Sequence, residues 1–449
     1  MGTPATAPGP LGPDMLRSFS AIRANPLAYL ETVWRKYGDV VQFPVPRPPS
    51  YLVNEPSAVR QVLVANARNY GKSTIQYRSL ALVTGEGLLV ADTEPWRRQR
   101  RMVQPAFHHQ TLERIVGHVN GALRRLAVDW DAASASRASV DIDAAMMHGA
   151  LEVVGHALFG TDLSSDAEQL TEATLDGLEV VVARARVPIS PPSWLPTPRN
   201  RQLRGAVRRL DAAVAAMIAQ REPGDRSEES SDMLDLLLNM RDETGDGLTQ
   251  TEVRDQVVTF IVAGHETVAS ALTWAWALLA AHPEALRAVQ EESNAILDGR
   301  DVTFADYERL PYARAVLDET MRLYPPAWLI TRKALEADTL AGHDIPAGAL
   351  VIMSPWLLHR HPEVWADPDR FAPERFLDGS ADRTAYIPFG AGPRMCIGRD
   401  FAYLEGVLML SWLAGRYDVS FPPGTSMPLG DPLVTIRPSG GLRLAPLTR

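Results

Sequence analysis

The sequence predicts a mainly α fold with a small β region (α+β). Apolar residues recur at spacings of three and four along several long segments, which is the pattern of amphipathic helices. Short runs rich in β-branched residues occur near the N-terminus, on either side of a proline-rich turn. With 449 residues, of which 46% are apolar and 22% charged, the chain is long enough to enclose a deep pocket.

The elements are expected in a definite order. A helix over Pro26–Tyr37 should precede two strands, residues 39–43 and 50–54, that form a hairpin. Helices should then cover residues 111–135, 141–159, 168–185 and 198–221. Prolines between residues 188 and 198 predict a bent connection that carries Ile189 and other apolar groups, which suggests a lid, and residues 222–231 have the composition of a solvated loop.

Residues 1–14, rich in proline and glycine, are expected to form a flexible segment ahead of a single domain over residues 15–449. The start lacks the features of a signal peptide, so a cytoplasmic location is expected. Acidic residues exceed basic ones by 54 to 45, and the formal charge of -9 disfavours nucleic acid and anionic membranes as partners. The single cysteine, Cys396, excludes disulfides, multi-thiolate zinc sites and iron–sulfur clusters.

The longest predicted helix covers residues 249–282 and, at about 1.5 Å per residue, would cross an entire domain. A transmembrane helix is the alternative, but His265, Glu266 and Thr267 interrupt the apolar run. A buried central helix is therefore predicted. Burial of Glu266 is unfavourable unless water or a partner meets it, which points to a functional role for this residue.

Cys396 lies in a glycine-rich loop, residues 389–398, ahead of a predicted helix over residues 400–413. Burial in the core is the common fate of a lone thiol, but a core strand would hardly contain three glycines, a proline and an arginine. A nucleophile in a phosphate-binding loop would need an arginine at the far end of the loop, and Arg399 comes too early. The third interpretation is a metal thiolate, which the following helix N-terminus would favour.

The loop resembles the ligand loop of the cytochrome P-450 family, Phe-x-x-Gly-x-Arg-x-Cys-x-Gly. The matching residues are Phe389, Gly392, Arg394, Cys396 and Gly398. The resemblance implies the cytochrome P-450 fold, with a long central helix over haem b and with Cys396 as the axial ligand of the haem iron. It also implies a bacterial-type haem-thiolate monooxygenase that occupies essentially the whole chain.

A charged motif agrees with this resemblance. Glu319 and Arg322 lie three residues apart, on one face of a predicted helix. In the family, such a pair forms a structural ion-pair triad with a second arginine, here Arg375. Without the family, a solvated surface pair of little energetic value would be the default interpretation.

A buried haem propionate requires cationic partners. The resemblance assigns contact with the propionates to Trp96 and to three cations, Arg100, Arg332 and Arg394. The neighbouring Arg97, Arg98 and Arg101 are expected to form a solvated basic face, which would also steer an acidic electron donor into place.

The central helix contains Ala263-Gly264-His265-Glu266-Thr267, which matches the oxygen-activation motif of the family. Ala263 and Gly264 are small enough for the helix to pass close to haem, and Thr267 can bond back to a carbonyl and open a groove for dioxygen. The resemblance implies that Glu266 and Thr267 deliver protons for oxygen–oxygen cleavage. His265 occupies the variable position of the motif and is expected to face away from the iron.

The segments that contact substrate in the family are mostly apolar in this chain. We therefore expect a fairly large apolar substrate, such as a terpenoid or polyketide, that receives one atom of O2 by hydroxylation or epoxidation. The expected lining residues are Leu80, Leu82, Ile189, Phe260, Ala263, Val268, Ala327, Leu329, Ile330, Leu433 and Val434.

Separate electron donors, a ferredoxin and its reductase, are expected because no flavin domain follows the cysteine loop. Two alternatives stay open. The same fold could serve a peroxygenase, isomerase or dehydratase that does not activate dioxygen, although Glu266 and Thr267 argue against this. The second alternative is a non-enzymatic haem protein that senses or carries a gas.

Overall fold

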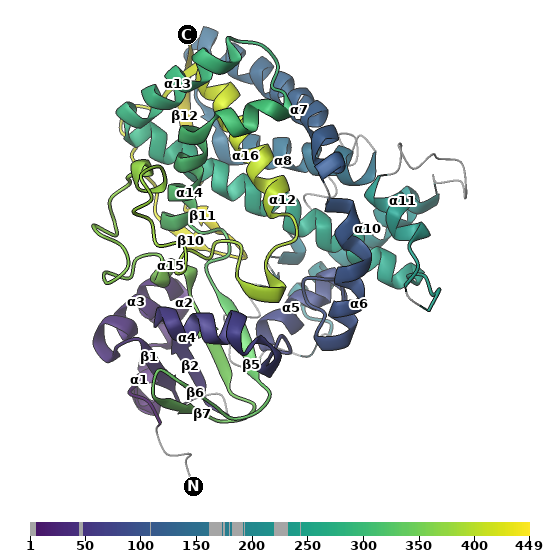
Figure 1. The fold of residues 1–449 in the computed structure, drawn as a ribbon, viewed down its shortest axis with the longest axis vertical. Helices are drawn as coiled ribbons and strands as arrows, with labels where there is room; N and C mark the ends of the chain where they lie inside the picture. The colour runs from purple at the N-terminus through teal and green to yellow at the C-terminus, as the bar shows by residue number, and fades with distance from the viewer. Residues whose placement is uncertain are drawn as a thin grey trace.

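The computed structural model describes residues 6–44, 48–107, 109–160, 194–219, 232–242 and 244–449, together with residues 173, 176–178, 180, 181 and 192. Helices form most of the molecule, and a smaller part rich in strands lies at the end that holds the N-terminus (Figure 1). The prediction of a mainly α fold with a small β region is thus confirmed.

The helices predicted over residues 26–37, 111–135, 141–159, 198–221, 249–282 and 400–413 are present with similar bounds. The described α-helices are α1 (Gly12–Arg17), α2 (Phe19–Ala24), α3 (Pro26–Tyr37), α4 (Pro56–Arg60), α5 (Ile75–Thr84), α6 (Thr93–Val103), α7 (His109–Ser136), α8 (Ile142–Phe159), α10 (Pro198–Ala219), α11 (Met233–Asn239), α12 (Gln250–Ala281), α13 (Pro283–Leu297), α14 (Pro311–Leu323), α15 (Pro355–Leu358) and α16 (Arg399–Arg416). The loop predicted over residues 222–231 and Ile189 of the predicted lid lie outside the described residues, as does most of the helix predicted over residues 168–185.

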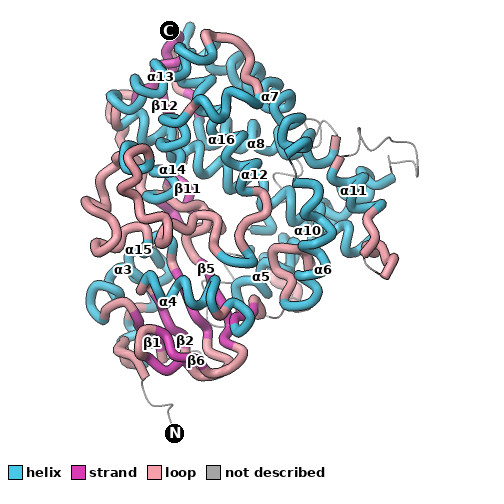
Figure 2. Tube along the Cα trace, viewed as in Figure 1, coloured by secondary structure: helices cyan, strands magenta, loops and turns pink. Residues whose placement is uncertain are grey.

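The strands in the described part of the chain form four small sheets. They are β1 (Val40–Phe43), β2 (Ser50–Val53), β3 (Tyr70–Gly71), β4 (Val140–Asp141), β5 (Ile330–Ala334), β6 (Asp338–Leu340), β7 (His343–Ile345), β8 (Leu350–Met353), β9 (Tyr417–Ser420), β10 (Gly430–Pro432), β11 (Ile436–Pro438) and β12 (Arg443–Thr448). The largest sheet has the order β1-β2-β8-β5-β3, and Figure 2 shows it beside the N-terminus. The predicted hairpin is confirmed, because β1 and β2 pair antiparallel with Val40 opposite Val53.

The N-terminal segment, which its composition predicts to be flexible, makes defined contacts with this sheet. The backbone N–H of Thr6 donates to Gln42 Oε1 at 2.7 Å, and the Thr6 hydroxyl lies 2.8 Å from that of Tyr51. The N–H of Gln42 in turn donates to the carbonyl of Pro8 at 2.8 Å. Residues 6–14 therefore belong to the folded part, and composition could not reveal this because the partners lie more than thirty residues away.

Helix α12 runs through the centre of the large apolar core. It begins at a capping box, in which the Thr249 hydroxyl accepts from the N–H of Glu252 and the Glu252 carboxylate accepts from the N–H of Thr249. By length and composition α12 could cross a membrane, but 83% of its most apolar stretch is buried inside the protein. The prediction of a buried central helix is thus confirmed.

Candidate active site

Cys396 lies directly before α16, in a loop that folds tightly on itself. The N–H of Cys396 donates to the carbonyl of Phe389 at 2.9 Å. Gly390 and Gly392 adopt φ angles of 70° and 69°, in the left-handed region that favours glycine. A Cβ on Gly392 would lie only 2.0 Å from the carbonyl oxygen of Leu63, so this glycine is what lets the loop pack against residues 61–65.

The Cys396 thiol is free and has accessible surface, although protein surrounds it. Burial raises the pKa of the thiol, while a hydrogen bond from the Gly398 backbone and the charges of Arg100 and Lys72 oppose that rise. Accessible surface on an enclosed sulfur indicates an internal space in front of it. In the described residues no three His, Cys, Asp or Glu side chains could hold a bare metal ion, so a metal at Cys396 would take its remaining ligands from a prosthetic group.

One face of α12 borders an internal space. From Asp255 to Leu279 every residue of the helix is buried except Ala263, Gly264 and Thr267. These three positions share one helix face, because Ala263 and Gly264 lie four and three residues before Thr267. They are the residues to which the sequence assigns contact with haem and dioxygen, and their accessibility supports that prediction.

Two local contacts shape this part of α12. The Thr267 hydroxyl donates to the carbonyl of Ala263 at 2.8 Å, as the sequence predicts. A Cβ on Gly264 would lie 3.0 Å from a methyl group of Val154 on α8. Close packing of α12 on α8 is therefore a reason for glycine that the sequence did not suggest.

The two polar residues between them, His265 and Glu266, are both buried. His265 is fully buried, its Nδ1 lies 2.6 Å from the carbonyl of Ile261, and burial lowers its pKa to about 4. A neutral ring at this position donates to that carbonyl, which agrees with a structural role. Glu266 is also buried, with one carboxylate oxygen 3.1 Å from the hydroxyl of Thr435, and burial raises its pKa.

A cluster of cations lies near the cysteine. Lys72 and Arg332 are each 6% exposed, and Arg394 is half-buried above the ring of Trp96, 4.4 Å from its centroid. The Arg100 guanidinium donates to the carbonyl of Met395 at 3.0 Å, one residue before Cys396. The structure therefore brings together the four predicted propionate partners and adds Lys72, which no motif indicates.

This cluster carries more positive charge than the described protein neutralises. Arg394 pairs with Asp92 at 2.9 Å, whereas Lys72 donates to the carbonyl of Leu89 and Arg332 to that of Thr331. Burial, together with the charges of Arg332 and Arg394, lowers the pKa of Lys72 well below its usual value. The charged form of Lys72 is therefore unfavourable here unless a further anion lies close by, and the two propionates of haem would supply one.

Arg98 departs from its predicted role. It donates to Asp242 at 2.7 Å and to Glu252 at 2.8 Å, so it ties α6 to the start of α12 rather than forming a free basic face. Arg97 pairs with the neighbouring Glu94. The prediction of a solvated basic face is wrong for Arg98, because its acidic partners lie far away in the sequence.

The predicted charged triad is assembled in the interior. The Arg322 guanidinium donates two hydrogen bonds, of 2.7 and 2.8 Å, to the Glu319 carboxylate, and both side chains are fully buried. Arg375 donates to the same carboxylate at 3.2 Å, and so does the backbone N–H of Ala372 at 2.9 Å. The surface interpretation is therefore excluded by the structure.

The predicted substrate residues do not all meet. Five of them pack in or against the large apolar core: Leu80, Leu82, Phe260, Val268 and Val434. Ile330 and Leu329 belong to two different smaller clusters, because successive residues of an extended chain face opposite ways. Ala327 and Leu433 are exposed, and Ile189 lies outside the described residues.

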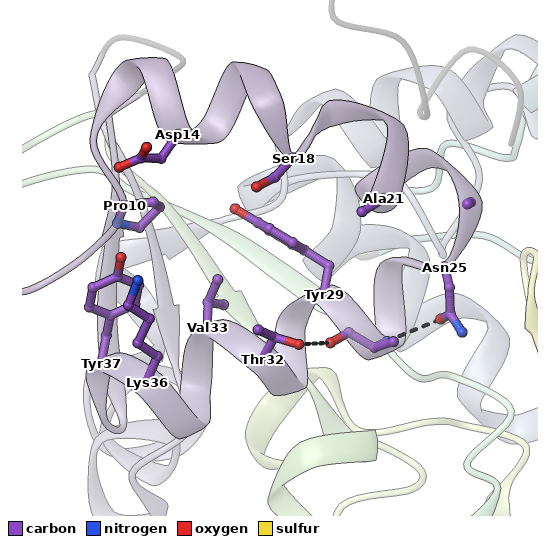
Figure 3. Close-up of a pocket in the computed structure, with 12 residues that line it drawn as sticks. Pro10, Asp14, Ser18, Ala21, Asn25, Tyr29, Thr32, Val33, Lys36 and Tyr37 are labelled. Atoms are coloured by element: carbon purple, nitrogen blue, oxygen red, sulfur yellow. Dashed lines mark hydrogen bonds between the residues drawn. The ribbon is translucent and has the colours of Figure 1, made fainter.

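A pocket of about 460 Å³ lies elsewhere, between α1–α2 and α3 (Figure 3). Asp14, Ser18 and Lys36 contribute to its lining, and Tyr29 points into it. Neither the cysteine nor any predicted substrate residue belongs to its lining, so this pocket is separate from the candidate active site.

Comparisons with known proteins agree with the geometry. The family model described as Cytochrome P450 matches residues 8–444. "Cyclooctat-9-en-7-ol 5-monooxygenase" of Streptomyces melanosporofaciens is 36% identical over 95% of this chain and 91% of its own length. "Cyclooctatin synthase" of the same organism is 36% identical over 90% and 87%, and "Pentalenene oxygenase" of Streptomyces avermitilis is 33% identical over 93% and 92%.

The match to the family model covers almost all of the chain, including the cysteine loop, the central helix and the charged triad. Two of these relatives are named as a monooxygenase and an oxygenase and match over most of the chain, and they favour neither of the two alternative functions. The chain therefore belongs to the cytochrome P450 family and is a monooxygenase, an oxidoreductase of a family that uses haem, dioxygen, a redox partner and a small-molecule substrate.

Proposed function

We propose that this enzyme binds haem b through Cys396 and oxidises a cyclic, apolar secondary metabolite of the terpenoid type. The cluster of buried Lys72 and Arg332 and half-buried Arg394 beside an accessible thiol carries the haem proposal, because an anionic group would complete its charge balance. A single cysteine suits haem b, since covalent attachment of haem would use further thiols. Turnover with isotopically labelled O2 tests the monooxygenase reaction, and we expect one labelled oxygen atom in the product. A product without label would favour a peroxygenase, isomerase or dehydratase.

The substrate class rests on the relatives and on the pocket residues. The names of two relatives contain pentalenene and cyclooctat-9-en-7-ol, which are apolar compounds with a carbon–carbon double bond. The five predicted lining residues that gather at the large core are aliphatic or aromatic. A panel of cyclic terpenoids, screened for a change in the ferric haem spectrum, tests this proposal directly.

The chain's own residues divide the work. When bound, haem supplies the activation of dioxygen and the transfer of one oxygen atom. Cys396 holds the iron, and the loop from Phe389 to Gly398 fixes the sulfur through its backbone. The accessible face of α12 leaves room for dioxygen, and Glu266 and Thr267 hold and move the protons that oxygen–oxygen cleavage consumes.

Thr267→Ala should keep the haem but uncouple the reaction. The Thr267 hydroxyl lies on the accessible face of α12, and without it protons arrive more slowly, so electrons leave as hydrogen peroxide. Peroxide and product are measured for each electron pair consumed. Thr251→Ala, an exposed position on the same helix, is the control and should not change the ratio. Unchanged coupling in Thr267→Ala would remove the proposed role.

Lys72→Met should weaken haem retention. Removing one cation from a buried anion site leaves a propionate partly unpaired, and we expect haem to transfer to an acceptor globin roughly tenfold faster, equivalent to about 1.4 kcal/mol. Lys333→Met is the matched control, because Lys333 is exposed on β5 next to the buried Arg332. Equal transfer rates in both variants would place Lys72 outside the haem site.

We further propose a ferredoxin and its reductase as electron donors and the cytoplasm as the location. The family requires an external or fused redox partner. Arg97 and Arg101 are exposed on α6, the helix that also carries Arg100, and their positive charge would attract an acidic ferredoxin. Reduction of the purified enzyme by ferredoxins from the same cells, compared with flavodoxins, tests the donor class.

A further inference from the structure

The β10–β11 hairpin is attached to the central helix by two buried hydrogen bonds. The carbonyl of Ile436 accepts from the hydroxyl of Ser270 and from the indole N–H of Trp274, each at 2.8 Å. Ser270 and Trp274 are four residues apart on α12 and both are fully buried. The position of this hairpin on α12 is therefore defined independently of its other contacts.

Glu266 belongs to the same face of α12, because it lies four residues before Ser270. The hydroxyl of Thr435, which is 2% exposed, donates to Glu266 Oε1 at 3.1 Å. The other carboxylate oxygen, Oε2, is buried and has no hydrogen-bond partner in the described structure. The hairpin thus occupies one oxygen of the carboxyl group and leaves the second free.

Charged groups surround this carboxyl without binding it. Arg437 is two residues after Thr435, on the same side of the strand, and it pairs with Asp143 of α8. Its charge lowers the pKa of Glu266 and that of Asp143 raises it, while burial has the largest effect and raises it. His265, the remaining titratable neighbour, is turned toward Ile261. Thr435 is accordingly the group that orients Glu266.

We propose that Thr435 is a positioning residue for catalysis, which holds Glu266 by Oε1 so that Oε2 is the atom that releases and regains the proton. This inference rests on the proposed function of Glu266 as a proton donor. Val434, the residue before Thr435, is a predicted substrate contact and packs against the large apolar core, so the same turn carries the acid's partner and a predicted substrate residue.

Thr435→Val is the decisive variant. Valine has nearly the shape of threonine but lacks the hydroxyl, and the bonds from Ser270 and Trp274 keep the hairpin in place. We expect the ratio of peroxide to product to rise roughly fivefold, the range expected for loss of one hydrogen bond. Thr435→Ser, which retains the hydroxyl, should restore the ratio. Thr435→Ala serves as a second hydroxyl-free variant if valine prevents folding.

Ser270→Ala is the matched control. It removes a bond of similar length between the same helix face and the same strand, without touching Glu266. The ratio should stay within the range of the unmodified enzyme. An equal rise in Ser270→Ala and Thr435→Val would overturn the proposal, because the attachment of the hairpin would then be the cause.

A spectroscopic readout separates this proposal from the role of Glu266 itself. With the haem-loaded enzyme and pentalenene as the probe compound, the infrared carbonyl band that disappears in Glu266→Gln should shift in Thr435→Val and remain in place in Ser270→Ala. A normal peroxide ratio in Glu266→Gln would refute proton donation by Glu266. If Glu266→Gln raises the ratio of peroxide to product, but Thr435→Val changes neither this ratio nor the infrared carbonyl band, only the positioning role is refuted.

Discussion

Cys396→Ala should reduce product formation to background and abolish the thiolate-type absorption of the reduced carbonyl complex. The substitution removes the sulfur but keeps the loop, because the hydrogen bond to Phe389 is made by the backbone N–H of residue 396. The cation cluster is also untouched, so haem should still bind. Difference spectra of the reduced protein with and without carbon monoxide measure the change.

Met395→Leu is the control for this experiment. It removes the neighbouring sulfur atom, which lies near the guanidinium of Arg399, and leaves Cys396 in place. The spectrum and the activity should be retained. A thiolate-type spectrum that survives in Cys396→Ala would contradict axial ligation by this residue, and with it the proposed haem site.

Glu319→Ala should cause the largest loss of stability among these variants. It leaves the fully buried Arg322 without its carboxylate, and breaking a buried ion pair in this way costs about 3–5 kcal/mol. That is a large fraction of the roughly 5–15 kcal/mol by which proteins are usually stable. Urea denaturation of the haem-loaded protein, followed by far-UV circular dichroism, measures the free energy of unfolding, and the visible absorption of the purified variant measures its haem content.

An exposed ion pair provides the comparison. Arg124 and Asp301 join α7 to the segment after α13, with 60% and 53% of their side chains exposed. Asp301→Ala should change the free energy of unfolding by no more than about 1 kcal/mol. If Glu319→Ala were as stable as Asp301→Ala and fully loaded with haem, the buried triad would have no special structural role.

Local patterns were sufficient to predict the main elements. The length of the mostly apolar segment over residues 249–282 predicts α12, and the proline-rich turn between residues 43 and 50 predicts the first hairpin. The cysteine loop could be identified because its constraints are local: left-handed glycines and a backbone bond close it within eight residues. Each of these features depends on neighbours in sequence.

Contacts between distant segments could not be predicted in this way. Lys72 joins the cation cluster only because β3 is brought beside β5, and an isolated lysine gives no signal of its burial. Thr435 meets Glu266 across 169 residues, and the acidic partners of Arg98 are 144 and 154 residues away. In an alignment of related sequences, co-variation between two such positions would be the signal that reveals the contact.

The close approach of Val154 to Gly264 limits how this enzyme can be redesigned. A Cβ at residue 264 would lie only 3.0 Å from a methyl group of Val154, so any larger residue there requires the contact between α12 and α8 to give way. Efforts to admit bulkier compounds should therefore begin at Leu80 or Leu82 on α5, where side chains can be trimmed without shifting the helix that carries Thr267.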